Sequence, residues 1–163
     1  MADLNKTRKN HKIGRQDWQT PQHVFDHWNN IFNFTLDAAA SKENALCWQY
    51  YTTDDLYQHI KLTDDHVLLH CTDGLIGLWD DRTWLNPPYG RGEIEKWVEK
   101  AYSQSKEGKL ICCLLPVSTS SKWWQNYVTK ADFIYYYPKR LRFGGATENA
   151  TFDNAIVIFG LKP

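Results

Sequence analysis

The segment Asn86-Pro87-Pro88-Tyr89 holds the residues of this sequence that are best suited to chemistry. Its two prolines remove two backbone N–H donors and restrict the chain, so nearby carbonyl oxygens are held in place as hydrogen-bond acceptors. The side chain of Asn86 adds an acceptor, and Tyr89 adds a flat ring. An exocyclic amino group on a purine offers two N–H donors and a ring face. The segment therefore predicts a site for a planar amine.

The same segment is suited to activating the amine that it binds. The lone pair of the amino nitrogen of adenine is delocalised into the ring, which makes this nitrogen a poor nucleophile. Two hydrogen bonds accepted from the amino group favour a pyramidal nitrogen and free its lone pair to attack a sulfonium methyl group. A Pro-Pro pair alone would indicate only a turn that ends a strand. Asn86 and Tyr89 around that pair favour methyl transfer.

The hydrophobic pattern predicts the elements that position this segment. Strands are predicted at residues 34–37, 66–71, 83–85, 109–117, 132–137 and 154–159, and helical apolar stripes run over residues 24–32, 94–102 and 123–128. This alternation indicates an α/β fold around a mainly parallel sheet, with ligands at the carboxyl ends of its strands. Thr20 and Pro21 are predicted to be the N-cap and first residue of the first helix. No helix separates the last two strands, which predicts an antiparallel pair at one edge of the sheet.

The charges of the chain balance, with 19 basic and 19 acidic residues among 163. A nucleic-acid partner is therefore not indicated by net charge and would be bound through local patches. One such patch contains five basic residues and no acid: Lys6, Arg8, Lys9, Lys12 and Arg15. We expect residues 1–15 to form a flexible basic arm and residues 16–163 to form one domain, because this length suits a single core.

The cysteines and the apolar runs indicate a reduced, cytosolic protein. Cys47, Cys71, Cys112 and Cys113 form no C-x-x-C pair, so neither a zinc site nor a disulfide framework is predicted. No apolar run is long enough to span a membrane, and the first 15 residues lack the apolar core of a signal peptide. The six histidines show no metal-ligand spacing, and no metal is expected.

The order of motifs along the chain resembles the phage-type DNA N6-adenine methyltransferase (Dam) family. Its matching segments, spread over about residues 17–160, are Asp17-Trp18-x-Thr20-Pro21, Phe34-x-Leu36-Asp37-x-Ala39, Tyr50-Tyr51, Asp73-Gly74-Leu75, Trp84-Leu85-Asn86-Pro87-Pro88-Tyr89-Gly90, Trp97-Val98-x-Lys100-Ala101, Leu114-Leu115-Pro116, Arg140-x-Arg142-Phe143 and the strand at 152–159. The motif N-P-P-Y by itself occurs in other amino-group methyltransferases, whereas the ordered set is much more specific.

The resemblance implies a Rossmann-like methyltransferase that uses S-adenosylmethionine to methylate the N6 amino group of adenine in DNA. Asn86, Pro87, Pro88 and Tyr89 would be its catalytic residues. A phage-encoded enzyme of this kind would work in the cytoplasm of its bacterial host. The N-P-P-Y motif also serves planar amides, so methylation of RNA or of a protein amide, and a non-catalytic DNA-binding module of the same fold, remain alternatives.

The resemblance also places the methyl donor beside the first strand. Asp37 and Ala39 would contact the donor, and Trp18, Thr20 and Pro21 would close over its methionine end. The chain has Ala-Ala-Ala-Ser after Asp37, where many methyltransferases have a glycine-rich loop. Two further acids are assigned to the donor, Asp73 to its adenine and Asp55 (or the neighbouring Asp54) to its ribose. Alternatively, Asp37 caps a following helix, and the other acids are exposed loop residues.

DNA is expected to be contacted by basic residues and one aromatic residue, namely Lys9, Lys12, Arg15, Arg140, Arg142 and Phe143. Arginines suit phosphate or guanine, and Phe143 would wedge into the base stack or hold an extruded base. A solvated basic loop is the alternative for residues 140–143. A target adenine must leave the duplex to reach the donor. No large insertion provides a recognition domain, so sequence specificity would come from short loops, the arm or the second subunit of a homodimer.

Overall fold

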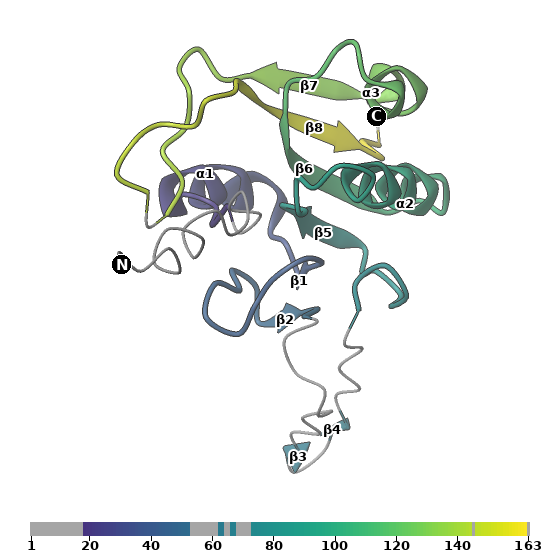
Figure 1. Cartoon of the computed structure of the whole chain (residues 1–163). Helices are drawn as coiled ribbons and strands as arrows, with labels where there is room; N and C mark the ends of the chain where they lie inside the picture. Colours follow the sequence, from purple (N-terminus) through teal and green to yellow (C-terminus); the bar gives the residue numbers. More distant parts are fainter. Residues whose placement is uncertain (1–17, 53–61, 64–65, 68–72, 145, 163) are drawn as a thin grey trace, which may run out of the picture.

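A six-stranded sheet forms the centre of the computed structural model, which describes residues 18–52, 62–63, 66–67, 73–144 and 146–162 (Figure 1). The strand order is β2-β1-β5-β6-β8-β7. The strands are β1 (Leu36–Asp37), β2 (Gln49–Tyr50), β5 (Arg82–Leu85), β6 (Leu110–Pro116), β7 (Phe133–Tyr136) and β8 (Asn154–Phe159). The helices are α1 (Gln22–Phe32), α2 (Ile94–Lys106), α3 (Lys122–Asn126) and the short 3₁₀ helix η1 (Val128–Lys130).

Parallel pairing joins the first four strands of this order, and antiparallel pairing joins the rest. β1 pairs in parallel with both β2 and β5, and β5 pairs in parallel with β6. β8 runs antiparallel to β6 on one side and to β7 on the other. The predicted antiparallel pair is thus confirmed. The antiparallel part of the sheet contains one more pairing than predicted, because β8 lies between β6 and β7 and runs antiparallel to both.

The central strand β6 shows why helices are needed on both faces of the sheet. Its residues alternate between two apolar clusters: Ile111, Cys113 and Leu115 pack on the side of α2, and Cys112 and Leu114 on the side of α1. All five are fully buried. Such continuous burial is typical of a strand that is covered on both faces. Figure 1 shows α1 and α2 on opposite sides of this strand.

Helix α1 packs through Val24, Phe25 and Trp28, as its apolar spacing predicts. Its start differs from the prediction by one residue. Pro21 has an extended backbone and is itself the N-cap, and no side chain caps the helix. The helix is started by the backbone of Pro21, whose carbonyl oxygen accepts hydrogen bonds from the N–H groups of Val24 (2.9 Å) and Phe25 (3.3 Å). Ile31, which the predicted apolar stripe includes, is 54% exposed.

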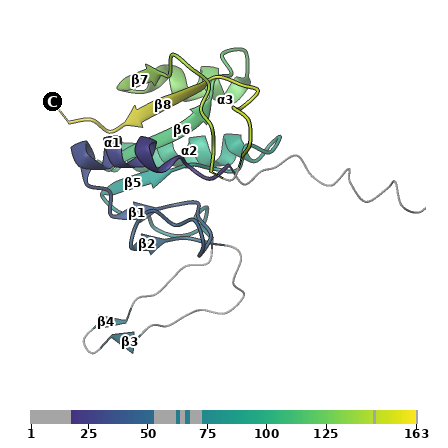
Figure 2. The ribbon, with the colours of Figure 1, turned by 90° about the vertical axis from the view of Figure 1, so that its left-hand side faces the viewer.

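One predicted strand does not join the six-stranded sheet. Within the predicted range 66–71, only β4 (His66–Val67) is described as a strand, and it pairs antiparallel with β3 (Leu62–Thr63). Together they form a separate two-stranded ladder (Figure 2). The other residues of the predicted strand lie outside the described residues, as do the predicted arm and Cys71.

The sheet topology determines where a site is built. Strands β1, β5 and β6 are parallel, so their carboxyl ends lie at one edge of the sheet. Asp37 ends β1, Leu85 ends β5 and Pro116 ends β6. The segment beginning at Asn86 leaves the sheet between the other two strand ends. Ligands of open α/β sheets bind at this edge.

Candidate active site

The Asn86–Tyr89 turn emerges from β5, whose last residues Trp84 and Leu85 are fully buried. The Asn86 side chain is held at both ends. Its Nδ2 donates a hydrogen bond to the carbonyl oxygen of Trp18, and its Oδ1 accepts one of 2.8 Å from the Tyr89 hydroxyl. A carbonyl can only accept, so the Trp18 contact fixes which end of the amide is Oδ1. An amide oxygen has two lone pairs, and Oδ1 can therefore accept a second donor besides Tyr89.

Tyr89 is tied to the turn by its hydroxyl and to the core by its ring. The hydroxyl lies 2.8 Å from Asn86 Oδ1 and 3.1 Å from the carbonyl oxygen of Leu114. The ring packs edge-on against Phe143 and Phe152, with centroids 6.3 Å and 5.6 Å away. Burial raises the pKa of Tyr89 well above its usual value, so the phenol keeps its proton and remains a hydrogen-bond donor. The contact between the hydroxyl and Asn86 was not predicted.

A first cavity of about 470 Å³ lies on one side of the turn. Six of its lining residues are ones that the resemblance assigns to the donor or to catalysis, namely Trp18, Thr20, Asp37, Ala39, Asn86 and Pro88. The cavity thus brings together the start of the described chain, the end of β1 and the Asn86–Tyr89 turn. Pro21 and Pro87 are buried and do not line it.

Asp37 and Glu43 are the acidic residues that line this cavity, and Asp37 is only 3% exposed. Its Oδ1 accepts a hydrogen bond of 3.4 Å from the backbone N–H of Ala39, and its Oδ2 accepts one of 3.2 Å from that of Leu46. Burial raises the pKa of Asp37 to about 6, although both hydrogen bonds act to lower it. The helix-cap alternative is wrong, because residues 38–48 are all described and contain no helix.

Among the described residues, no other acid assigned to the donor is found in the cavity wall. Asp73 does not line the cavity; its Oδ1 accepts a hydrogen bond of 2.8 Å from the backbone N–H of Leu75 and so shapes the turn that carries Gly74. Gly74 itself is part of the cavity wall. Asp54 and Asp55 lie outside the described residues.

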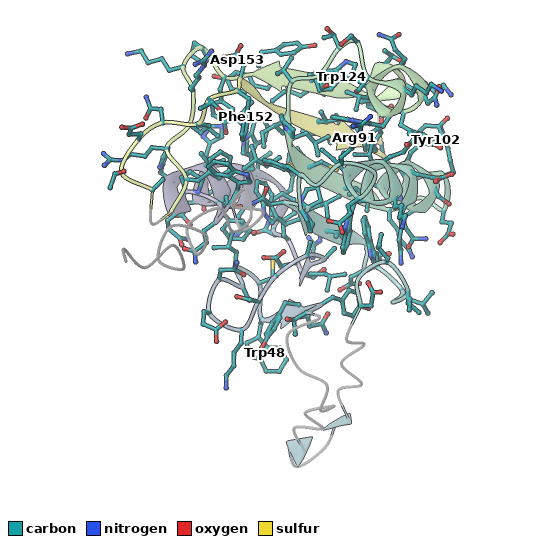
Figure 3. All side chains as sticks on the ribbon, viewed as in Figure 1. Trp48, Arg91, Tyr102, Trp124, Phe152 and Asp153 are labelled. Atoms are coloured by element: carbon teal, nitrogen blue, oxygen red, sulfur yellow. The ribbon has the colours of Figure 1, made fainter. Side chains whose placement is uncertain are left out.

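A second cavity of about 960 Å³ lies on the other side of the turn. Trp18 lines both cavities, whereas Asn86 and Pro88 face the first and Tyr89 and Gly90 the second. The remaining wall of the second cavity includes Arg91, Pro116, Lys122, Trp123 and Phe152. Figure 3 labels Arg91 and Phe152, which come from the segments after β5 and before β8. Arg91, Lys122 and Phe152 were not predicted as site residues from the sequence. A usable signal for Arg91 was its position two residues after Tyr89.

The prediction that Phe143 contacts DNA bases is wrong for this structure, because the side chain is buried. Its side chain is 2% exposed, and its ring centroid lies 5.1 Å from that of Trp18. A ring packed in this way contacts the rings of Trp18 and Tyr89 inside the core and has no face exposed to DNA. Alternating exposure explains the error: Arg142 before it and Gly144 after it are exposed, while Phe143 points into the core.

The predicted DNA-contacting arginines are exposed but line neither cavity. Arg140 forms an ion pair of 3.3 Å with Asp153, and Arg142 Nε donates a 3.2 Å hydrogen bond to the carbonyl oxygen of Ala146. Lys9, Lys12 and Arg15 lie outside the described residues.

Three of the four cysteines lie in the described ranges. Cys47, Cys112 and Cys113 are buried, free thiols there. These ranges hold no group of three or more His, Cys, Asp or Glu side chains arranged to bind a metal ion. None of the helices described is both long enough and apolar enough to cross a membrane.

Comparison with known proteins identifies the family. Residues 6–158 match the family model described as DNA N-6-adenine-methyltransferase (Dam). The chain is similar to the DNA N-6-adenine-methyltransferase of Escherichia phage T1, with 32% identity over 113 residues that make up 68% of this chain and 40% of the phage protein. The chain thus matches less than half of that relative's length. Because the family model covers nearly the whole sequence, including Asp37 and Asn86–Tyr89, the chain belongs to the DNA N-6-adenine-methyltransferase (Dam) family.

Proposed function

We propose that this protein transfers a methyl group from S-adenosylmethionine to the N6 amino group of adenine in DNA, on a Rossmann-like methyltransferase fold. The observation that carries the proposal is the position of the Asn86–Tyr89 turn between two cavities. A transferase must bring two substrates together at one point. Here Asn86 lines the first cavity, Tyr89 lines the second, and Trp18 borders both.

The first cavity fits the methyl donor. Its volume of about 470 Å³ is within the usual range for small-molecule sites, roughly 300–1,000 Å³. Asp37 places a carboxylate in it, which suits the ammonium group of a methionine moiety. Ala39 has only a methyl side chain and Gly74 has none, so the ligand can approach the backbone there. S-adenosylmethionine, when bound, supplies an electrophilic methyl group.

The second cavity suits an adenine that has left the duplex. Tyr89, Trp123 and Phe152 provide aromatic surface for stacking, and Arg91 and Lys122 provide positive charge for the adjacent phosphates. The Arg140–Arg142 loop is a further proposed phosphate contact.

Asn86 and the turn carry out the chemistry in this proposal. Asn86 Oδ1 accepts one N–H of the adenine amino group through its remaining lone pair, and a backbone carbonyl of the proline turn accepts the other. The two acceptors favour a pyramidal nitrogen with its lone pair directed at the methyl group. The nitrogen becomes acidic only after it has gained the methyl group, so its proton passes to water and no strong general base is required.

Donor binding should depend on pH through Asp37. Burial raises the pKa of this carboxyl to about 6, so the carboxylate is ionised above that pH and neutral below it. Only the ionised form attracts the donor's ammonium group. The affinity for S-adenosylhomocysteine should therefore be constant at pH 7–8 and fall by about tenfold for each pH unit below about 6. Isothermal titration calorimetry between pH 5 and 8 measures this dependence.

The matched variant for this measurement is Asp37→Asn. Asparagine has the same shape and no charge, so its affinity should be weak and independent of pH. Asparagine keeps one acceptor oxygen but places an NH2 group against the other backbone N–H, of Ala39 or Leu46, so the unfolding temperature of Asp37→Asn is measured beside its affinity to verify the fold. An affinity of the parent protein that does not change between pH 5 and 8 would contradict a role for Asp37 in binding the donor.

The basic arm is proposed to bind DNA without sequence preference. Deletion of residues 1–14 removes Lys6, Arg8, Lys9 and Lys12 and should weaken binding to all DNA sequences equally. Each phosphate contact that is lost should reduce the slope of log affinity against log salt concentration by about 0.9. Fluorescence anisotropy of labelled duplexes at several salt concentrations gives this slope. An unchanged slope would mean that the arm does not contact phosphate.

The choice of substrate is tested by direct competition. DNA, RNA and protein are incubated side by side with the enzyme and a donor that carries a labelled methyl group. We expect label in DNA only. Label in RNA or protein would show that RNA or protein is the substrate in place of DNA. Binding of the donor without any transfer would identify a non-catalytic module.

A further inference from the structure

We propose that Lys100 is a positioning residue that holds one wall of the donor cavity in place. The inference rests on the proposed function, because it assigns the first cavity to the donor. Lys100 lies in α2 and does not line that cavity. It acts on the cavity through the turn at residues 73–79.

The Lys100 ammonium group binds three carbonyl oxygens of this turn. Its Nζ lies 2.9 Å from the oxygen of Gly74, 3.0 Å from that of Leu75 and 2.5 Å from that of Gly77. An ammonium group has three N–H donors, so one side chain can serve all three carbonyls. Hydrogen bonds from a charged donor are roughly twice as strong as those between neutral groups. Lys100 also lies over the ring of Trp79, 5.3 Å from its centroid.

The turn held by Lys100 contacts the cavity at two points. Gly74 lines the cavity, and a Cβ at Gly74 would lie 1.9 Å from the carbonyl oxygen of Ala38, so its backbone packs directly against the end of β1. Gly77 packs in the same way against the ring of Tyr51, which also lines the cavity. A shift of this turn therefore changes the cavity wall at both Gly74 and Tyr51.

The arrangement depends on a cation at this position. Three carbonyl dipoles converge on one point, and without a positive charge they repel one another. Trp79 donates from Nε1 to the Gly74 oxygen at 2.7 Å, but it satisfies only that one carbonyl. Removing the Lys100 charge should release Leu75 and Gly77 and let the Gly74 backbone move away from Ala38.

Helix α2 also explains how this wall is kept in register with the catalytic turn. The helix begins at Ile94, just after the turn, and its Trp97 lines the donor cavity. Lys100 lies one turn further along the helix. One rigid element thus fixes both the site of methyl transfer and the wall of the donor cavity.

The test is Lys100→Met, which keeps the length of the apolar stem and removes the ammonium group. The dissociation constant of S-adenosylhomocysteine, measured by calorimetry, and the KM for S-adenosylmethionine should rise about tenfold or more. The KM for DNA should stay unchanged, because the second cavity does not contact this turn. Lys100→Gln, which keeps an amide donor, should give a smaller loss of donor affinity.

Lys96→Met is the matched control, since Lys96 is exposed on the same helix four residues earlier. It should bind the donor product as the parent does. Unchanged affinity for S-adenosylhomocysteine in Lys100→Met would overturn the inference, as would equal rises in the KM for donor and for DNA. If Lys100→Met does not fold, Lys100→Gln is tested by the same two measurements, the affinity for S-adenosylhomocysteine and the KM for donor compared with that for DNA. A parent protein that binds no S-adenosylhomocysteine would instead refute the proposed function.

Discussion

Asn86→Ala is expected to lower kcat by about 10²–10³-fold, because it removes a preorganised hydrogen-bond acceptor that acts on the reacting amino group. The structure makes this acceptor specific: Oδ1 is oriented by the contacts of Asn86 with Trp18 and Tyr89. Affinity for S-adenosylhomocysteine should fall little, since Asn86 is one of many residues that line the donor cavity. Single-turnover methylation of a DNA duplex measures the loss directly.

Two variants control this result. Asn86→Asp keeps an acceptor but loses the N–H donor to the Trp18 carbonyl, so it should retain more activity than Asn86→Ala. Asn126→Ala changes an exposed asparagine at the end of α3 that lines neither cavity, and it should have no effect. Near-normal turnover by Asn86→Ala would remove Asn86 from the mechanism.

Tyr89→Ala is expected to lose methylation activity severely. In the proposed site, the Tyr89 ring replaces part of the stacking that the adenine gives up when it leaves the duplex. Base–aromatic stacking contributes about 1–3 kcal/mol, equivalent to roughly 5–150-fold in rate or affinity. The loss of the contact with Asn86 Oδ1 adds to this effect. Tyr136→Ala, which changes an exposed tyrosine of β7, should be unaffected.

Tyr89→Phe separates the ring from the hydroxyl. It keeps the ring but loses the bond to Asn86 Oδ1, and one such bond contributes about 1 kcal/mol. The Trp18 carbonyl still orients Asn86, so a loss of about fivefold is expected. With 2-aminopurine at the target position, fluorescence should rise on extrusion and be partly quenched by either ring. If Tyr89→Phe is as inactive as Tyr89→Ala, the stacking role is wrong.

Strands β5, β6, β7 and β8, the end of β1 and the proline turn after β5 could be predicted because their signals are local, whereas β2 was not predicted. An apolar run such as 110–116 has few alternatives to a buried strand, and two prolines after Leu85 must end β5. Asp37 was identified in the same way, as a carboxylate at the end of a short apolar strand. These features depend on neighbours in sequence, and they reappear in the fold at the expected positions.

The second cavity could not be predicted because it depends on distant contacts. Arg91, Lys122 and Phe152 come from three segments that only the sheet order β5-β6-β8 brings together. Phe143 was misassigned for a related reason: its neighbours suggested a polar loop, but the rings of Trp18 and Tyr89 bury it. The hydroxyl contact of Tyr89 likewise follows from the path of the turn and from β6, which supplies the Leu114 carbonyl.

The most direct test of the central claim is nucleoside analysis after methylation. Unmodified DNA is incubated with the protein and S-adenosylmethionine that carries a labelled methyl group, digested to nucleosides and separated, with Asn86→Ala as the control. The account predicts that all label appears as N6-methyladenine and that the control reduces it by about 10²–10³-fold. Label in N4-methylcytosine, or an unlabelled digest from a protein that binds the donor, would contradict it.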